Sequence, residues 1–404
     1  MTETFRPIPE GDYFKNPGYL KLDLMLNGVR VDPSLFQKSL ILKEYRLSPS
    51  LCGNLDLILP EETHVSVPYQ EEFTIHSPYK LRGLHGKYTL SGREHSAVVK
   101  IVPHPSFYDE RVNSAVRIGD VAQCHGGYVS LALGGHRYLQ SHLNGSSGAL
   151  STAPATGRLV LSVDEVIGLL DRIRKETAID VITLSAWSAK GEDGGILQIE
   201  PYIRAIKASF NVLLLVEVHL PNVRSMIDQT YAMGADSVCY HLGNLCSHGD
   251  QPPAPGRSTE QELHLLRHAV SIFPPGSILS HITMGSRPFA EVIEDIGLLT
   301  GIKVLPILTV EGLEVVRQKG LTTAQLAPLF GYVYNAAKRA KITMNWFSRL
   351  APFVAPIEGR FFSGDSPKLK LALLNFYQSR FLGGSISAGL SNLRRKLRVR
   401  EVKK

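Results

Sequence analysis

Cysteine and long apolar runs are scarce in this chain of 404 residues. Its four cysteines, Cys52, Cys124, Cys239 and Cys246, match neither a CxxC metal-binding pair nor a dense disulfide framework, so we expect buried free thiols. No apolar run approaches the roughly 18 residues that a membrane helix needs. The first residues, MTETFRPIPEGDY, also lack the basic stretch and apolar core of a secretion signal. These absences predict a cytoplasmic protein with no membrane-spanning segment.

A surplus of charge is also missing from most of the chain. The net charge is +7, and the last fourteen residues, SNLRRKLRVREVKK, hold seven basic side chains against Glu401. The other 390 residues therefore carry a net charge of only +1. Because a nucleic-acid binder usually presents a basic face on its folded surface, we expect no nucleic acid as the main ligand and interpret the basic tail as solvated.

Composition and pattern divide the chain into three regions. Hydrophobic residues make up 44% and charged residues 20%, as is typical of soluble globular proteins. Short apolar runs between turn-rich stretches predict a β-rich N-terminal region over residues 1–115. Longer apolar runs then alternate with segments of helical period over residues 116–310. A helical extension follows over residues 311–404, with helices expected at Thr322 to Lys341 and Ser366 to Phe381.

Six apolar segments of the middle region have the length and composition of buried strands. Ser162 with Glu165, and Ser258 with Gln261, have capping-box spacing and predict helix starts between these strands. The expected strands are Tyr128 to Gly135, Val181 to Ser185, Val212 to His219, Asp236 to Tyr240, Ser277 to Met284 and Ile302 to Leu308, and further helices are expected at Glu200 to Ser209, Asn222 to Met233 and Pro288 to Leu299.

Apolar strands separated by helices are typical of a parallel sheet with right-handed crossovers. The predicted fold is therefore α/β, a partial (β/α)6 TIM-like barrel with an N-terminal β-rich region and a C-terminal helical extension. In such a barrel the ligand lies at the C-terminal ends of the strands.

Titratable residues stand near the ends of three of these strands. Glu217 and His219 are two residues apart on a strand and therefore share a face, where a buried charge needs a partner or a task. Strand ends with His241 and His281 follow, so a common cavity for a small molecule is expected. The expected pocket contains Gly191, Glu192, Glu217, His219, Tyr240 and His281, with His136 or Asn144 at its rim.

The order of elements and several weak motifs resemble the radical S-adenosylmethionine superfamily over about residues 118–310. The resemblance rests on six strand–helix units, the Gly191-Glu192 turn after the second strand, and a fifth strand similar to Gly-x-Ile-x-Gly that ends at Met284-Gly285. The segments DGGILQIEPYIRAI (Asp193 to Ile206) and YAMGADSVCYHL (Tyr231 to Leu242) read like its second and fourth units.

That family holds a [4Fe-4S] cluster with three cysteines in the loop after the first strand. The corresponding loop here, residues 136–152, contains no cysteine, so no iron–sulfur cluster is expected. The resemblance implies that Gly191-Glu192 lies near the methionine ammonium of S-adenosylmethionine. It also implies that a polar ribose contact after the fourth strand would be Asn244.

The leading hypothesis is a cluster-free enzyme of this type that binds S-adenosylmethionine or a related small molecule. Its chemistry would be polar, such as methyl or aminocarboxypropyl transfer or a lyase reaction in a biosynthetic pathway, with Glu217 or His219 as the base. His281 or Tyr240 would orient the acceptor. Two alternative functions stay open: a non-catalytic partner or substrate carrier of an active radical enzyme, and a lyase using a metal on His136 and His142. Assembly as a homo-oligomer or with a partner enzyme is also left open.

Overall fold

The computed structural model describes residues 9–47, 53–84, 86–92, 94–133, 161–185, 192–242, 245, 258–285, 287–310, 313–344 and 352–363. Within these residues, no helix is both long and apolar enough to cross a membrane. Cys124 and Cys239 are buried free thiols, as predicted, whereas Cys52 and Cys246 lie outside the described residues.

The larger of two sheets has seven strands in the order β13-β12-β11-β10-β9-β8-β7. Strands β8 to β13 run parallel to their neighbours, while β7 forms an antiparallel hairpin with β8. The strands are β7 (Ala122–His125), β8 (Tyr128–Ala132), β9 (Val181–Ser185), β10 (Leu213–His219), β11 (Ser237–His241), β12 (Ile278–Met284) and β13 (Leu305–Val310).

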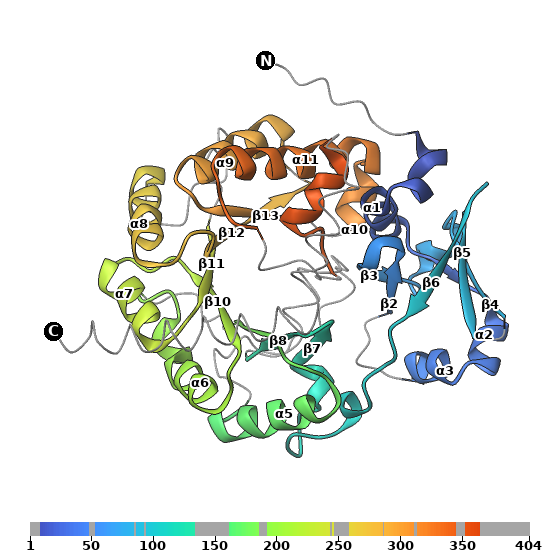
Figure 1. The fold of residues 1–404 in the computed structure, drawn as a ribbon, viewed down its shortest axis with the longest axis horizontal. Helices are drawn as coiled ribbons and strands as arrows, with labels where there is room; N and C mark the ends of the chain where they lie inside the picture. Colours follow the sequence, from blue (N-terminus) through green and yellow to red (C-terminus); the bar gives the residue numbers. More distant parts are fainter. Residues whose placement is uncertain are drawn as a thin grey trace.

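Helices connect these parallel strands and cover the outer side of the curved sheet (Figure 1). Two of them begin at the predicted capping boxes: Ser162 and Glu165 bond reciprocally before α5, and Ser258 and Gln261 do so before α8. Their apolar faces join the outward side chains of the strands in one large core. The helices are α5 (Val163–Glu176), α6 (Ile196–Ser209), α7 (Arg224–Met233), α8 (Thr259–Ile272) and α9 (Phe289–Gly301).

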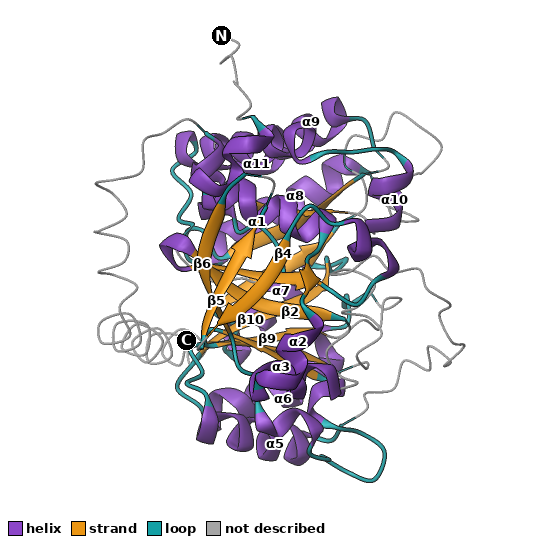
Figure 2. Cartoon of the chain, turned by 90° about the vertical axis from the view of Figure 1, so that its right-hand side faces the viewer, coloured by secondary structure: helices purple, strands orange, loops and turns teal. Residues whose placement is uncertain are grey.

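The smaller sheet has six strands in the order β1-β4-β5-β6-β2-β3 and lies beside the larger one (Figures 1 and 2). In β2, alternate residues Leu55, Leu57 and Leu59 are buried, and they pack in one core with Leu20 and Leu24 of α1. Its elements are α1 (Pro17–Asn27), β1 (Arg30–Val31), α2 (Pro33–Lys38), α3 (Leu40–Leu47), β2 (Asn54–Leu59), β3 (Thr63–Pro68), β4 (Lys80–Leu84), β5 (Lys87–Ser91) and β6 (Ser96–Ile101). Short 3-10 helices are η1 (Glu10–Lys15), η2 (Pro60–Glu62), η3 (Glu72–His76), η4 (Ser106–Asp109) and η5 (Ile118–Asp120).

The C-terminal elements close part of the concave side of the larger sheet. These are α11 (Thr323–Arg339) and η6 (Pro356–Phe362), whereas α10 (Leu313–Gln318) contacts α1 through a hydrogen bond from Arg317 to the carbonyl of Leu26. Tyr334 and Ala337 of α11 form a buried cluster with inward-facing strand residues such as Leu215 and Leu279. The helix predicted at Thr322 to Lys341 is therefore confirmed as α11, and the one predicted at Ser366 to Phe381 lies outside the described residues.

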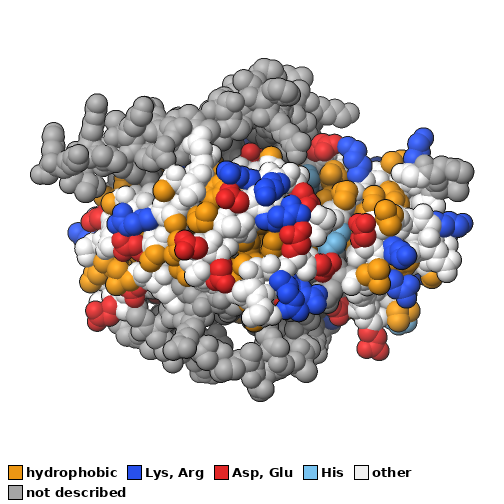
Figure 3. Space-filling model, turned by 90° about the horizontal axis from the view of Figure 1, so that it is seen from below, with side chains coloured by type: hydrophobic (Ala, Val, Ile, Leu, Met, Phe, Trp, Pro, Cys, Tyr) orange, Lys and Arg blue, Asp and Glu red, His pale blue; other side chains and the backbone are white. Residues whose placement is uncertain are grey.

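Charged side chains of both signs are interspersed over the described part of the face in Figure 3. On α5, for example, Arg172 lies 2.6 Å from Glu110 and 2.9 Å from Glu176, and Arg174 lies 3.0 Å from Asp171. Exposed pairs of this kind stabilise a fold little. The mixture of both signs agrees with the near-neutral charge of residues 1–390.

The expected mixed α/β class is confirmed, because one sheet is mainly parallel with helical crossovers and the other is almost wholly antiparallel. The finer assignment of the larger sheet to a partial (β/α)6 barrel stays a prediction.

Candidate functional site

A row of three histidines crosses the larger sheet on the face opposite its covering helices. His219 of β10 is the register partner of His241 in β11. Tyr240 pairs with Ser280 of β12, so the next step along both strands brings His241 beside His281. These positions lie at or near the C-terminal ends of parallel strands, where open α/β sheets bind ligands. We call His219, His241 and His281 the histidine row.

The rings of the histidine row lie close to one another. The ring centroids of His241 and His281 are 5.0 Å apart with nearly parallel planes, and those of His219 and His241 are 5.9 Å apart and tilted. All three residues are partly buried. The three titratable rings lie on the same face of the sheet as a buried apolar cluster that includes Leu215 and Leu279.

Glu217 is two residues before His219 in β10, so its side chain lies on the same face of the sheet as the histidine row. Its Oε1 is 3.8 Å from Nε2 of His281, and both side chains are only 18% exposed. The hydroxyl of Ser185, the register partner of Glu217 in β9, donates a hydrogen bond to Oε2. The carboxylate is thus fixed by a neutral donor on one side and faces an imidazole on the other.

The charge of His281 follows from this arrangement. Burial disfavours the imidazolium, but the neighbouring Cys239 sulfur and the Glu217 carboxylate outweigh burial and raise the pKa of His281. Burial also raises the pKa of the Cys239 thiol, so this sulfur is protonated at neutral pH. We therefore attribute the charge of His281 mainly to Glu217. The neighbouring carboxylate therefore favours the imidazolium form of His281.

This assignment predicts that replacing Glu217 with glutamine lowers the pKa of His281. The amide keeps the size of the side chain and a hydrogen bond with Ser185, but it removes the negative charge that favours the imidazolium. Titration of the ring nitrogens by ¹⁵N NMR measures the shift. Glu72→Gln, at an exposed position of η3, is the matched control. An unchanged pKa in Glu217→Gln would show that another group holds the proton on His281.

The end of β10 is positioned by the turn after β9, residues 192–195. The amide of His219 donates to the carbonyl of Gly194 over 3.2 Å, and the amide of Asn222 donates to the carbonyl of Glu192 over 2.7 Å. The Asp193 carboxylate accepts from the amide of Leu197 at the start of α6. The glycine-rich turn therefore positions His219 at the end of β10, and the Glu192 side chain of this turn is exposed.

The structure brings together only part of the predicted site. Glu217, His219 and His281 share one face, but Tyr240 lies on the opposite face, fully buried in the outer core among residues such as Val216. Alternation along β11 explains this, because Cys239 and His241 take the inward positions. Four predicted site residues lie outside the described residues, namely Gly191, Asn244, His136 and Asn144.

Among the described residues, no group of three or more histidine, cysteine, aspartate or glutamate side chains is arranged to hold a metal ion. The predicted lyase ligands His136 and His142 lie outside the described residues.

Two inward residues of this site were not predicted as part of it. Ser185 and Cys239 follow from the register, since they are the partners of Glu217 in β9 and β11. The period-two pattern could have identified both once the strands were aligned by their polar ends. Their short, uncharged side chains gave no separate signal in the sequence.

Comparisons with known proteins identify no family. No family model matches the sequence, and no curated protein matches it. Among solved structures, the chain is similar to a dihydropteroate synthase in complex with pteroic acid from Coxiella burnetii, at 11% sequence identity and a TM-score of 0.24. That similarity covers 45% of this chain and 86% of the synthase. At this TM-score it supports no conclusion about ligand or activity.

Proposed function

We propose that this protein is an enzyme that transfers protons on a small molecule bound at the histidine row. One observation carries the proposal: Glu217 and His281 form a partly exposed pair at the C-terminal side of a parallel sheet, next to two further histidines. A carboxylate beside an imidazolium supplies both halves of acid–base catalysis. Active sites typically contain two neighbouring titratable groups whose surroundings shift their pKa values apart.

Each residue has a distinct part in this proposal. Glu217 accepts a proton from a carbon or heteroatom of the substrate, and the electron pair of the broken bond stays on the substrate. His281 donates a hydrogen bond or its proton to the atom that gains this negative charge. Ser185 is a positioning residue, because its hydroxyl holds one oxygen of Glu217 and leaves the other toward His281.

The ligand of this site is proposed to be S-adenosylmethionine or a related molecule, held in a partial (β/α)6 barrel that lacks an iron–sulfur cluster. The exposed carboxylate of Glu192 supports the proposal, because the turn that carries it contacts the end of β10. A carboxylate there suits the ammonium group of an amino-acid moiety. When bound, the nucleotide supplies an electrophilic methyl or aminocarboxypropyl group.

The proton-transfer proposal is tested with a mixture of cellular metabolites in deuterated water. We expect the wild-type protein to consume at least one metabolite or label it with deuterium, as followed by mass spectrometry. Glu217→Gln should slow this reaction by about 30-fold or more, corresponding to roughly 2 kcal/mol or more of transition-state stabilisation. Glu72→Gln should react like the wild type. A mixture left unchanged by the wild type, or changed equally fast by Glu217→Gln, would reject the proposal.

The nucleotide proposal needs a separate measurement. Calorimetry should detect binding of S-adenosylmethionine or S-adenosylhomocysteine, and Glu192→Gln should weaken it by about threefold or more because an ion pair at the rim is lost. Glu72→Gln again serves as the control. If neither S-adenosylmethionine nor S-adenosylhomocysteine binds, the nucleotide proposal is rejected. The proposal of proton transfer at the histidine row is not affected by that result.

A further inference from the structure

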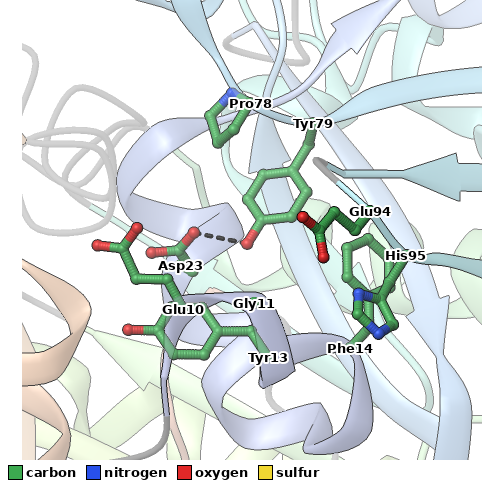
Figure 4. A pocket seen from close by; sticks show the side chains of 9 residues that line it. All are labelled: Glu10, Gly11, Tyr13, Phe14, Asp23, Pro78, Tyr79, Glu94 and His95. Atoms are coloured by element: carbon green, nitrogen blue, oxygen red, sulfur yellow. Dashed lines mark hydrogen bonds between the residues drawn. The ribbon is translucent and has the colours of Figure 1, made fainter.

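A pocket in the N-terminal part of the molecule lies between η1, α1 and the residues that flank β4 and β5 (Figure 4). Its lining residues all fall between positions 10 and 95, and none of them belongs to the histidine row. The pocket is therefore independent of the function proposed above.

Aromatic rings form much of the lining. Phe14 and Tyr79 have ring centroids 5.9 Å apart, and Phe14 stacks on the imidazole of His95 with centroids 6.4 Å apart. Figure 4 shows the rings of Tyr13 and Tyr79 facing the same space. The faces of such rings attract positively charged groups.

A carboxylate lies at the inner side of the pocket. Asp23 accepts a hydrogen bond of 2.6 Å from the Tyr79 hydroxyl and one of 2.5 Å from the Thr323 hydroxyl. Burial raises the pKa of Asp23, and the hydrogen bonds from Thr323, Tyr79 and Asn27, all neutral groups, only oppose that effect. A cation next to Asp23 would offset the desolvation of this charge more effectively than neutral donors do.

Tyr13 adds a second polar group beside the carboxylate of Asp23. Its side chain is 98% buried, and Tyr13 is one of the residues that line the pocket. Figure 4 shows this hydroxyl on the same side as the carboxyl groups of Glu10 and Asp23. A hydroxyl oxygen in this position can accept a hydrogen bond from a donor that enters the pocket.

We propose that this pocket binds the primary ammonium group of a small organic molecule. The ammonium donates hydrogen bonds to Asp23 and to the hydroxyl oxygen of Tyr13, and its alkyl chain lies against Phe14 and Tyr79. Glu94, exposed at the rim, adds attraction for the approaching cation. Ring faces attract both primary and quaternary ammonium groups. The oxygens of Asp23 and Tyr13 favour a primary ammonium, because a quaternary one has no N–H to donate to them.

The proposal is tested by titrating the full-length protein with butylammonium chloride at constant ionic strength, with binding followed by saturation-transfer NMR. We expect saturable binding of butylammonium, weaker binding of tetramethylammonium and no saturable binding of butanol. Tyr13→Phe keeps the ring and removes the acceptor, so it should weaken butylammonium binding by about tenfold. Phe14→Leu and Glu94→Gln should each weaken it by about two- to fivefold.

Matched variants keep the test decisive. Glu72→Gln removes an exposed carboxylate outside the pocket and should bind butylammonium as the wild type does. Glu94→Gln lies at an exposed position, so it tests the site even where Tyr13→Phe fails to fold. Failure of butylammonium to bind, equal binding of butanol, or unchanged affinity in Glu94→Gln and folded Tyr13→Phe would overturn the proposal.

Discussion

Replacing Lys21 with methionine should lower the free energy of unfolding by about 3 to 5 kcal/mol. Lys21 of α1 is fully buried, and its Nζ lies 3.1 Å and 2.8 Å from the two carboxylate oxygens of Glu358 in η6. Burial lowers the pKa of Lys21 and raises that of Glu358, so each charge depends on the other. Without the lysine, the Glu358 carboxylate would be buried without its cation.

Chemical denaturation measures this effect, and two further variants define its cause. Lys15→Met removes the lysine of an exposed pair with Asp12 and should change stability by less than about 1 kcal/mol. Adding Glu358→Gln to Lys21→Met should restore part of the loss, because the uncompensated charge disappears. Equal effects of Lys15→Met and Lys21→Met would show that burial of the Lys21–Glu358 pair does not determine its contribution.

The local pattern of the sequence predicted much of the larger sheet. Val181 to Ser185 is β9 as predicted, and the other five predicted strands overlap β8 and β10 to β13 with shifted ends. The capping boxes at Ser162 and Ser258 both start helices. Strand and helix periods, as well as caps, depend on residues a few positions apart, so one sequence is enough to recognise them.

Contacts between distant residues could not be predicted in this way. Lys21 and Glu358 are separated by 337 positions, and neither stands in a motif that marks the other as its partner. The position of Tyr240 shows a second limit. Tyr240 and His241 are adjacent at the end of β11, so their side chains point to opposite faces of the sheet. The observed register shows that His241 faces inward and that Tyr240 belongs to the outer core.

Replacing Gly194 with alanine should destabilise the protein by about 3 kcal/mol or more and displace the end of β10. The backbone of Gly194 has a φ of +67°, a conformation that costs alanine roughly 1 to 2 kcal/mol. A Cβ there would also lie 2.2 Å from the carbonyl oxygen of His219. Backbone atoms cannot move aside as the end of a flexible side chain does, so the turn or the strand must shift.

A glycine-to-alanine substitution at another position should instead increase the stability of the protein. Gly297 lies inside α9 with no atom within 4 Å of a Cβ, so Gly297→Ala should stabilise the protein by about 0.5 to 1 kcal/mol. Thermal and denaturant unfolding compare the two variants, and NMR shifts of His219 and His281 report on the site. Because the 192–195 turn bonds directly to His219, Gly194→Ala should change the His219 signals even below the melting temperature. A variant with wild-type stability and unchanged histidine signals would mean that this turn does not position the histidine row.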